Sequence, residues 1–377
     1  MASVDTEPKL ATLLEAREAR RALPAYTPKP DAEVAAALEQ FFRTVAPNSA
    51  VSGVARIGGG ASKEMFVFTL ETPGEGAQRY ILCMDPLVAV TETDRKREAE
   101  AMAAFQGIVP APRPAWVACN GEILGQPAVI MELVSGVTKP SGGATKVSGL
   151  GTYLGPRLRE LLRGQFLDNL IKIHAFDWRD ANFQNFDFPL SDPKQAARWQ
   201  VGYWAELWRQ DADHASPIMV VAERWLRENL PSCDELVFVH ADYRTGNYLF
   251  DEASGRMTAM LDWELSYVGD FHDDLAWILT PLFGTYEDGV FRASDLYERE
   301  EFIEAYEQRT GRSVNRRTLH FYEVFAAYKC YVITAASGMG AARTAHNHQD
   351  ILLTFLSGAS PMFRADLCRL LSQRDFA

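Results

Sequence analysis

Hydrophobic positions in the first third of the chain change from the spacing of helices to the alternation of strands. Apolar residues after Pro30 recur three and four positions apart, which predicts a helix that ends before Pro47. The segments that follow alternate apolar and polar side chains, as half-buried strands do. An earlier helix is predicted over residues 9–23, and we expect it to lie outside the core fold. The predicted order is two helices, three strands, a charged helix and two strands, over residues 9–23, 31–45, 51–57, 65–70, 79–84, 93–105, 116–119 and 128–132.

Beyond residue 135 the pattern becomes mainly helical. Residues 135–151 are rich in Gly, Ser and Thr and predict a loop. This change predicts an α+β protein in three parts: an N-terminal helical extension (1–48), a small lobe with an antiparallel sheet (49–134) and a large, mainly helical lobe (135–377). The helices expected in the large lobe cover residues 158–176, 194–210, 218–229, 273–283, 299–309, 317–337 and 349–357.

One stretch of the large lobe interrupts this helical pattern with two short apolar runs. Residues 236–239 lead into the sequence His-Ala-Asp-Tyr-Arg-Thr-Gly-Asn, and residues 257–261 lead to Asp262. Residues 248–250 follow this sequence, and the turn-forming residues 251–256 between them and residues 257–261 predict a hairpin. This hairpin would present Asp242, Asn247 and Asp262 together.

These three side chains match the needs of phosphoryl transfer. That reaction requires a carboxylate to accept or orient the proton of the attacking hydroxyl, and hard oxygen ligands for Mg²⁺. Asp242 can act on the hydroxyl, and Asn247 and Asp262 can hold the metal. The alternative interpretation is a hairpin whose polar side chains are only solvated.

The His-x-Asp-x4-Asn pattern, followed by Leu-Asp-Trp-Glu, resembles the aminoglycoside phosphotransferase and choline kinase group. It differs from the more usual His-Gly-Asp by having Ala241. A Trp-rich helix and the sequence Trp-Leu-Arg-Glu-Asn-Leu-Pro at residues 225–231 are most similar to the kinase domains fused to acyl-CoA dehydrogenases. The resemblance implies a bilobal protein-kinase-like fold, with ATP as cofactor, GTP as a possible substitute, and Mg²⁺.

In the small lobe, the resemblance assigns residues to the nucleotide. Glycines between two strands let backbone N–H groups approach phosphates, so Gly59, Gly60 and Ser62 would line them. The segment after the fifth strand resembles a kinase hinge, where the carbonyl of Glu132 and the N–H of Val134 would meet the adenine edge.

The expected cation of the third strand is missing. Glu98 matches the helix glutamate that normally pairs with a basic residue there, but Cys83 occupies that position. A cysteine cannot neutralise a phosphate. Lys63 in the glycine loop and Arg244 beside the catalytic aspartate are the candidates to supply the charge, and a structural salt bridge is the alternative for Arg244.

Other large-lobe residues have structural or open interpretations. We expect Asp274 to brace the catalytic loop and His174 to be a satisfied core histidine. Trp178 and Glu264 receive no chemical role. The aromatic residues Trp199, Tyr203, Trp204 and Trp208 recur at helical spacing, which fits core packing or, alternatively, an apolar wall for a substrate.

Composition narrows the class of partner. The formal net charge of −12 over 377 residues argues against nucleic acid. The five cysteines lack CxxC spacing and predict reduced thiols. Residues 1–24 have no apolar core and no run is long enough to span a membrane, so we expect a cytoplasmic protein without a signal peptide. The oligomeric state stays open.

We therefore predict an ATP- and Mg²⁺-dependent phosphotransferase acting on a hydroxyl group of a small molecule. The resemblance favours a hydroxyacyl thioester or another largely apolar compound. The alternatives are an aminoglycoside-type antibiotic kinase and a catalytically weak nucleotide-binding scaffold. A protein kinase is disfavoured because Asp-Trp-Glu stands in place of Asp-Phe-Gly at residues 262–264.

Overall fold

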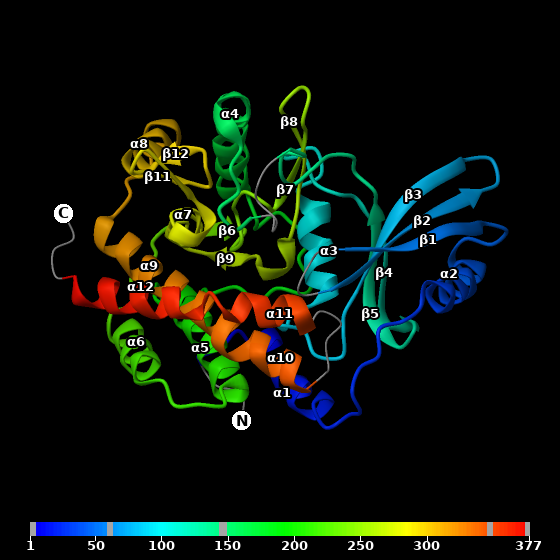
Figure 1. Ribbon diagram of the computed structural model, residues 1–377, viewed down its shortest axis with the longest axis horizontal. Helices are drawn as coiled ribbons and strands as arrows, with labels where there is room; N and C mark the ends of the chain where they lie inside the picture. Colours follow the sequence, from blue (N-terminus) through cyan, green and yellow to red (C-terminus); the bar gives the residue numbers. More distant parts are fainter. Residues whose placement is uncertain (1–4, 59–62, 143–148, 345–349, 374–377) are drawn as a thin grey trace.

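The small lobe is a five-stranded antiparallel sheet with a helix on each side (Figure 1). The computed structural model describes residues 5–58, 63–142, 149–344 and 350–373. The strands lie in the order β1-β2-β3-β5-β4. The elements are α1 (Pro8–Arg20), α2 (Asp31–Val45), β1 (Ala50–Ile57), β2 (Glu64–Thr72), β3 (Gly76–Met84), α3 (Arg95–Ala104), β4 (Pro114–Ile123) and β5 (Gln126–Glu132).

The two faces of this sheet belong to different cores. On one face, Phe66 and Leu82 pack with the apolar stripe of α2, including Val34 and Phe42, which the helical spacing had predicted. On the other face, Cys83 belongs to the main core, which α3 shares with the large lobe. Because side chains alternate along a strand, Cys83 points toward α3.

The large lobe is mainly helical, and short strand pairs carry the catalytic stretch. Strand β6 (Val237–Val239) pairs with β9 (Tyr267–Gly269), and β7 (Tyr248–Asp251) pairs with β8 (Arg256–Met260) as the expected hairpin. A third sheet contains β10 (Thr285–Glu287), β11 (Val290–Ala293) and β12 (Tyr297–Glu298). The helices are α4 (Gly155–His174), α5 (Gln195–Asp211), α6 (Pro217–Glu228), α7 (His272–Ile278), α8 (Arg299–Thr310), α9 (Arg316–Val332), α10 (Gly338–Thr344), α11 (Asp350–Ser357) and α12 (Ser360–Ser372).

Two expectations about the helices were wrong, and a third was confirmed with a local change of helix type. The helix expected over residues 273–283 ends at Ile278, because Pro281 begins a separate 3₁₀ turn. The helix expected over residues 317–337 is confirmed, and its last turn, Ile333–Ser337, is π-helical. Helix α1 does not lie outside the core: Leu10 and Leu14 belong to the main buried cluster.

Helix α1 connects the two lobes through a buried arginine. The guanidinium of Arg17 pairs with Asp211 of α5 at 2.7 Å and donates to the carbonyl of Ala89, ahead of α3, at 3.0 Å. Burial lowers the pKa of Arg17. Among the described residues, no helix is long and apolar enough to cross a membrane.

Candidate active site

The loop after β6 is held by a carboxylate from α7. The backbone N–H groups of His240 and Ala241 donate to the two carboxylate oxygens of Asp274, each at 2.8 Å. The bracing role expected for Asp274 is confirmed by these bonds. His174 lies 3.0 Å from the same carboxylate and 2.8 Å from the hydroxyl of Tyr306, so it is the satisfied core histidine that was predicted.

A buried lysine, which the sequence analysis missed, holds the other side of the same peptide. The ammonium of Lys329, on α9, donates to the carbonyl of Ala241 at 2.5 Å, and Lys329 is only 2% exposed. Its sequence signal was a single charge within an otherwise apolar helical run. Ala241 itself has φ of 65°, in the left-handed region that favours glycine.

Two donors converge on one oxygen of the proposed catalytic carboxylate. Oδ1 of Asp242 accepts from Nε of Arg244 at 2.9 Å and from the indole N–H of Trp277 at 2.7 Å. The guanidinium of Arg244 also lies over the ring of Phe283, 4.7 Å from its centroid. Arg244 therefore has the salt bridge that was its structural alternative, and Trp277 is a contact that the sequence did not reveal.

The two proposed metal ligands lie at the ends of the hairpin. Nδ2 of Asn247 donates to the carbonyl of Asp242 at 2.9 Å, which leaves Oδ1 as the oxygen suited to a cation. The backbone N–H of Leu261 donates to the carbonyl of Asn247 at 2.8 Å, which places Asp262 beside it. Burial, with Glu264 nearby, raises the pKa of Asp262 to about 7.

This donor set fits Mg²⁺ held together with a nucleotide. Among the described residues, no group of three or more His, Cys, Asp or Glu side chains could hold a metal alone. Mg²⁺ in nucleotide sites is typically held by one or two carboxylates plus substrate phosphates, and it keeps several waters. One carboxylate and one amide oxygen, from Asp262 and Asn247, are consistent with that arrangement.

The cation beside Glu98 is Lys63, which directly precedes β2 and was one of the two candidates to supply the charge missing at Cys83. The ammonium of Lys63 lies 2.9 Å from Oε1 of Glu98 and 3.0 Å from Oε2 of Glu264. Cys83, on β3, pairs with Met65 in the strand register, and burial raises the pKa of its thiol to about 12. Lys63, just ahead of β2, thus supplies the charge that is missing on β3.

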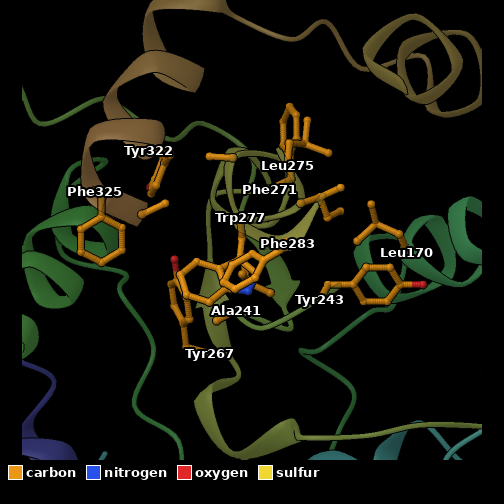
Figure 2. Close-up of a cluster of buried hydrophobic side chains, with 14 of the residues drawn as sticks. Leu170, Ala241, Tyr243, Tyr267, Phe271, Leu275, Trp277, Phe283, Tyr322 and Phe325 are labelled. Carbon is orange, nitrogen blue, oxygen red and sulfur yellow. The ribbon is translucent and has the colours of Figure 1, made fainter. Parts of the chain in front are cut away.

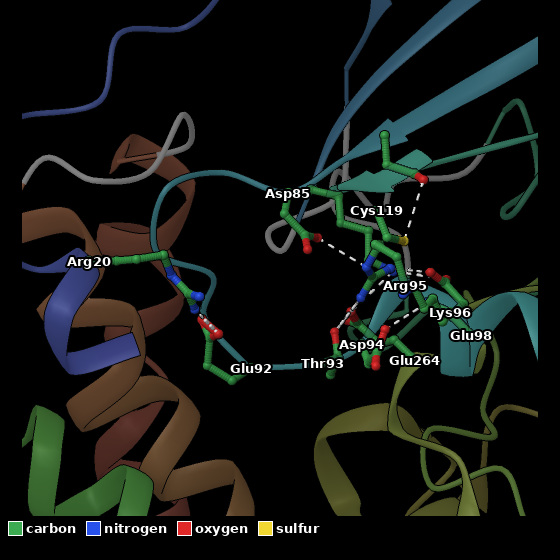
Figure 3. Close-up of polar contacts among 12 residues, drawn as sticks. Arg20, Asp85, Glu92, Thr93, Asp94, Arg95, Lys96, Glu98, Cys119 and Glu264 are labelled. Atoms are coloured by element: carbon green, nitrogen blue, oxygen red, sulfur yellow. Dashed lines mark hydrogen bonds and ion pairs between the residues drawn. The ribbon is translucent and has the colours of Figure 1, made fainter. Parts of the chain in front are cut away.

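Arg95 extends this ion pair into a buried network (Figure 3). It lies 2.9 Å from Glu264 and 3.0 Å from Asp85, and it also pairs with Glu98. Burial alone would raise the pKa of Glu264, but Lys63 and Arg95 lower it to about 2. Glu264, which had no role at the sequence level, is therefore the carboxylate that joins the two cations.

The other expected nucleotide contacts stay predictions. Gly59, Gly60 and Ser62 lie outside the described residues. Glu132 is the last residue of β5, and its side chain accepts a hydrogen bond from Gln78 at 2.7 Å. Val134 follows and is half-buried. The adenine contacts of Glu132 and Val134 stay predictions.

The aromatic residues of α5 pack in the core and do not form an open wall. Trp199, Tyr203 and Trp204 are buried. The hydroxyl of Tyr203 donates to the carbonyl of Glu92 at 2.7 Å. Trp208 stacks on Tyr331 with ring centroids 5.7 Å apart. This favours the core-packing interpretation of the pattern over the substrate wall.

Comparison with known proteins defines the class to which this site belongs. The profile of the Phosphotransferase enzyme family matches residues 53–322, and the chain belongs to that family. Acyl-CoA dehydrogenase family member 11 of Gallus gallus is 28% identical over 274 residues, 68% of this chain and 33% of that protein. A probable acyl-CoA dehydrogenase of Arabidopsis thaliana is 24% identical over 257 residues, 63% of this chain and 30% of that protein. The chain spans about a third of the length of these curated relatives.

Solved structures show the same fold. A protein assigned as an aminoglycoside phosphotransferase from Ralstonia eutropha has a TM-score of 0.63 at 23% identity, with 90% of this chain and 99% of that chain covered. An aminoglycoside phosphotransferase in a ternary complex with AMP-PNP and hygromycin B has a TM-score of 0.54 at 15% identity, with 88% and 98% covered. The predicted bilobal kinase-like fold and the resemblance to both groups of proteins are confirmed.

Proposed function

We propose that this chain is an ATP- and Mg²⁺-dependent phosphotransferase that phosphorylates a hydroxyl group of a small molecule. The observation that carries the proposal is the convergence of Asp242, Asn247 and Asp262 around one hairpin, with Lys63 as a neighbouring cation. Asp262 interacts electrostatically with both Lys63 and Asp242. The hairpin thus brings a carboxylate for the acceptor close to ligands for the metal.

Each residue then has a separate task. Oδ1 of Asp242 is occupied by two donors, so Oδ2 is the oxygen that we assign to the acceptor hydroxyl. Asn247 and Asp262 would hold Mg²⁺, which neutralises charge on the transferred phosphoryl group when bound. Lys63 and Arg244 would contact phosphate oxygens, with Glu98 orienting Lys63. Gly59, Gly60 and Ser62 would support the phosphates, and Glu132 and Val134 the base of ATP or GTP.

Lys63 favours an active enzyme over the scaffold alternative. Without Lys63, the position that carries a cation in the resembling family would offer only the thiol of Cys83. A buried Lys63 that is paired with Glu98 at 2.9 Å supplies a charge that is held in place before the nucleotide arrives. Preorganised charge of this kind is what phosphoryl transfer requires of a protein.

We infer that the acceptor is a hydroxyacyl thioester or a similar, largely apolar compound. The curated relatives are named as acyl-CoA dehydrogenase family members, and the aligned part of this chain covers 33% and 25% of the length of two of them. A phosphotransferase joined to such an enzyme would act on a related acyl compound.

We also propose that the chain is cytoplasmic. It would divide into the extension 1–48 and the lobes 49–134 and 135–377.

An acceptor panel tests this function. The protein would be incubated with Mg²⁺ and γ-labelled ATP, together with hydroxyacyl-CoA compounds that carry the hydroxyl at successive chain positions. Transfer of label to one of these, and its loss on chelation of Mg²⁺, is the expected result. Labelling of aminoglycosides instead would replace the acceptor class, and Mg-ATP binding without transfer to any acceptor would support the scaffold.

A further inference from the structure

The indole of Trp277 is placed where it can control the proposed catalytic carboxylate. Trp277 lies on α7, is 3% exposed, and packs against Phe283 with ring centroids 4.8 Å apart (Figure 2). Its N–H donates to Oδ1 of Asp242 at 2.7 Å. An indole has one N–H and can only donate, so this contact is directional.

A cation covers the face of the same indole. The ammonium of Lys329 lies 4.0 Å from the ring centroid of Trp277 while it donates to the carbonyl of Ala241. A cation over an aromatic face is attracted electrostatically by the π electrons of the ring. In a buried site its charge also polarises the N–H group of the indole. Lys329 thus fixes Trp277 and the catalytic loop to each other.

We propose that Trp277 is a positioning residue that holds Asp242 in the orientation in which Oδ2 meets the acceptor hydroxyl. The proposal rests on the proposed function. The other donor to Oδ1, Arg244, is on a flexible side chain and is also assigned to phosphate charge. When the guanidinium turns toward a phosphate, the indole is the donor that keeps the carboxylate in place. A small rotation of such a carboxylate is enough to slow transfer, because reacting atoms must be held close and aligned.

The test compares Trp277→Phe with Trp178→Phe as a matched control. Trp178 is also buried, and its indole N–H donates to the carbonyl of Leu236 at 3.1 Å, away from Asp242. A hydrogen bond to a charged group contributes enough that Trp277→Phe should lower kcat on the order of 10-fold. KM for Mg-ATP should stay unchanged, and Trp178→Phe should keep the kcat of the wild type. Equal kcat values for both variants would overturn the proposal.

A double-mutant cycle separates positioning from a general structural role. Asp242→Asn removes the charged partner, so adding Trp277→Phe to it should cost no further activity. A further loss would mean that Trp277 acts through the fold. If Asp242→Asn alone kept full activity, the proposed function would fail, whereas a normal Trp277→Phe beside an inactive Asp242→Asn would reject only this inference.

A spectroscopic measurement applies even without an acceptor. Each of the eight tryptophans gives one indole N–H resonance after ¹⁵N labelling, and Trp277→Phe identifies the one that is lost. We expect this resonance to lie downfield and to move upfield in Asp242→Asn, while that of Trp178 stays in place. If the chemical shift of the Trp277 resonance were the same in Asp242→Asn as in the wild type, the proposal would be overturned.

Discussion

The left-handed backbone of Ala241 destabilises the catalytic loop slightly, and its neighbours compensate. An L-residue in this conformation costs roughly 1–2 kcal/mol, because Cβ crowds the following carbonyl. At Ala241 the N–H is bound by Asp274 and the carbonyl by Lys329, which together hold the peptide in place. Glycine is more usual at this position in the aminoglycoside phosphotransferase and choline kinase group, and it would adopt the same conformation without that cost.

Replacing Ala241 by glycine should therefore stabilise the protein. We expect the free energy of unfolding to rise by about 1 kcal/mol, measured by denaturant titration. Ala276→Gly, in the neighbouring helix α7, is the control and should lower it by about 1 kcal/mol. A lower stability of Ala241→Gly would show that the methyl group contributes packing that outweighs the backbone strain.

The cation of the small lobe stands at a different sequence position from the one that the family resemblance implied. Lys63 precedes β2 and Cys83 lies on the adjacent strand β3, so both positions approach the carboxylate of Glu98. Burial and Arg95 would lower the pKa of Lys63, but three carboxylates raise it, those of Glu264, Glu98 and Asp262. A second lysine at position 83 would share Glu98 and Asp262 with Lys63.

This arrangement predicts the outcome of exchanging the two residues. Lys63→Met should weaken Mg-ATP binding roughly 10- to 100-fold, since a charge-assisted contact contributes about 1.5–3 kcal/mol. Cys83→Lys alone should lower the melting temperature, because it buries a cation beside Lys63 and Arg95. The double variant should recover part of the affinity in titration calorimetry. Wild-type affinity of Lys63→Met would remove Lys63 from the nucleotide site.

At the scale of elements, α1 links the lobes through buried charge. Arg17 is fully buried between Asp211 and the segment that precedes α3. The segment that Arg17 contacts at Ala89 leads into α3, which carries Glu98. Arg17 itself lies far from the catalytic hairpin in the sequence.

Removing the charge of Arg17 should be costly. Loss of one partner of a buried ion pair typically costs about 3–5 kcal/mol, so Arg17→Ala should reduce the free energy of unfolding by that amount. Arg209→Ala is the comparison, because Arg209 forms an exposed pair with Glu206 on the same helix as Asp211, and such pairs contribute about 0–1 kcal/mol. Similar losses for both variants would contradict the assigned role of α1.

Local signals predicted the elements, but not the contacts between them. The stripe of α2 and the hairpin of β7 and β8 were correct because periodicity and turn residues are local properties. The end of the helix at Ile278 was missed although Pro281 marked it. The place of α1 in the core could not be predicted, because Arg17 finds Asp211 only after the chain has folded.

The same limit applied to the site. The spacing of Asp242, Asn247 and Asp262 could be recognised in the sequence, since one hairpin carries all three. Trp277 and Lys329 were not, because each reaches the loop from a distant helix.

At the scale of the whole molecule, buried carboxylates make stability depend on pH. Burial raises the pKa of Asp273 to about 6 from its ordinary 3.8, although Lys329 and a bond from Tyr267 oppose the shift. The folded protein then binds this proton more tightly than the unfolded chain. The stability from Asp273 is fully present below pH 3.8 and is lost as the pH rises through 6.

Asp273→Asn should remove this dependence. Because one pKa unit corresponds to about 1.36 kcal/mol, the stability of the variant relative to the wild type should rise by about 2 kcal/mol between pH 4 and pH 6. Urea titrations across that range measure it. A constant difference between the two proteins would mean that Asp273 is ionised throughout.

The central claim is that Asp242 acts on the acceptor while other residues hold the nucleotide. The most direct measurement is the rate of phosphoryl transfer by Asp242→Asn, together with its Mg-ATP affinity and with exposed Asp251→Asn on the same hairpin as control. We predict that transfer falls on the order of 100- to 10,000-fold, with Mg-ATP affinity retained and Asp251→Asn unaffected. Transfer by Asp242→Asn at the wild-type rate would contradict the account.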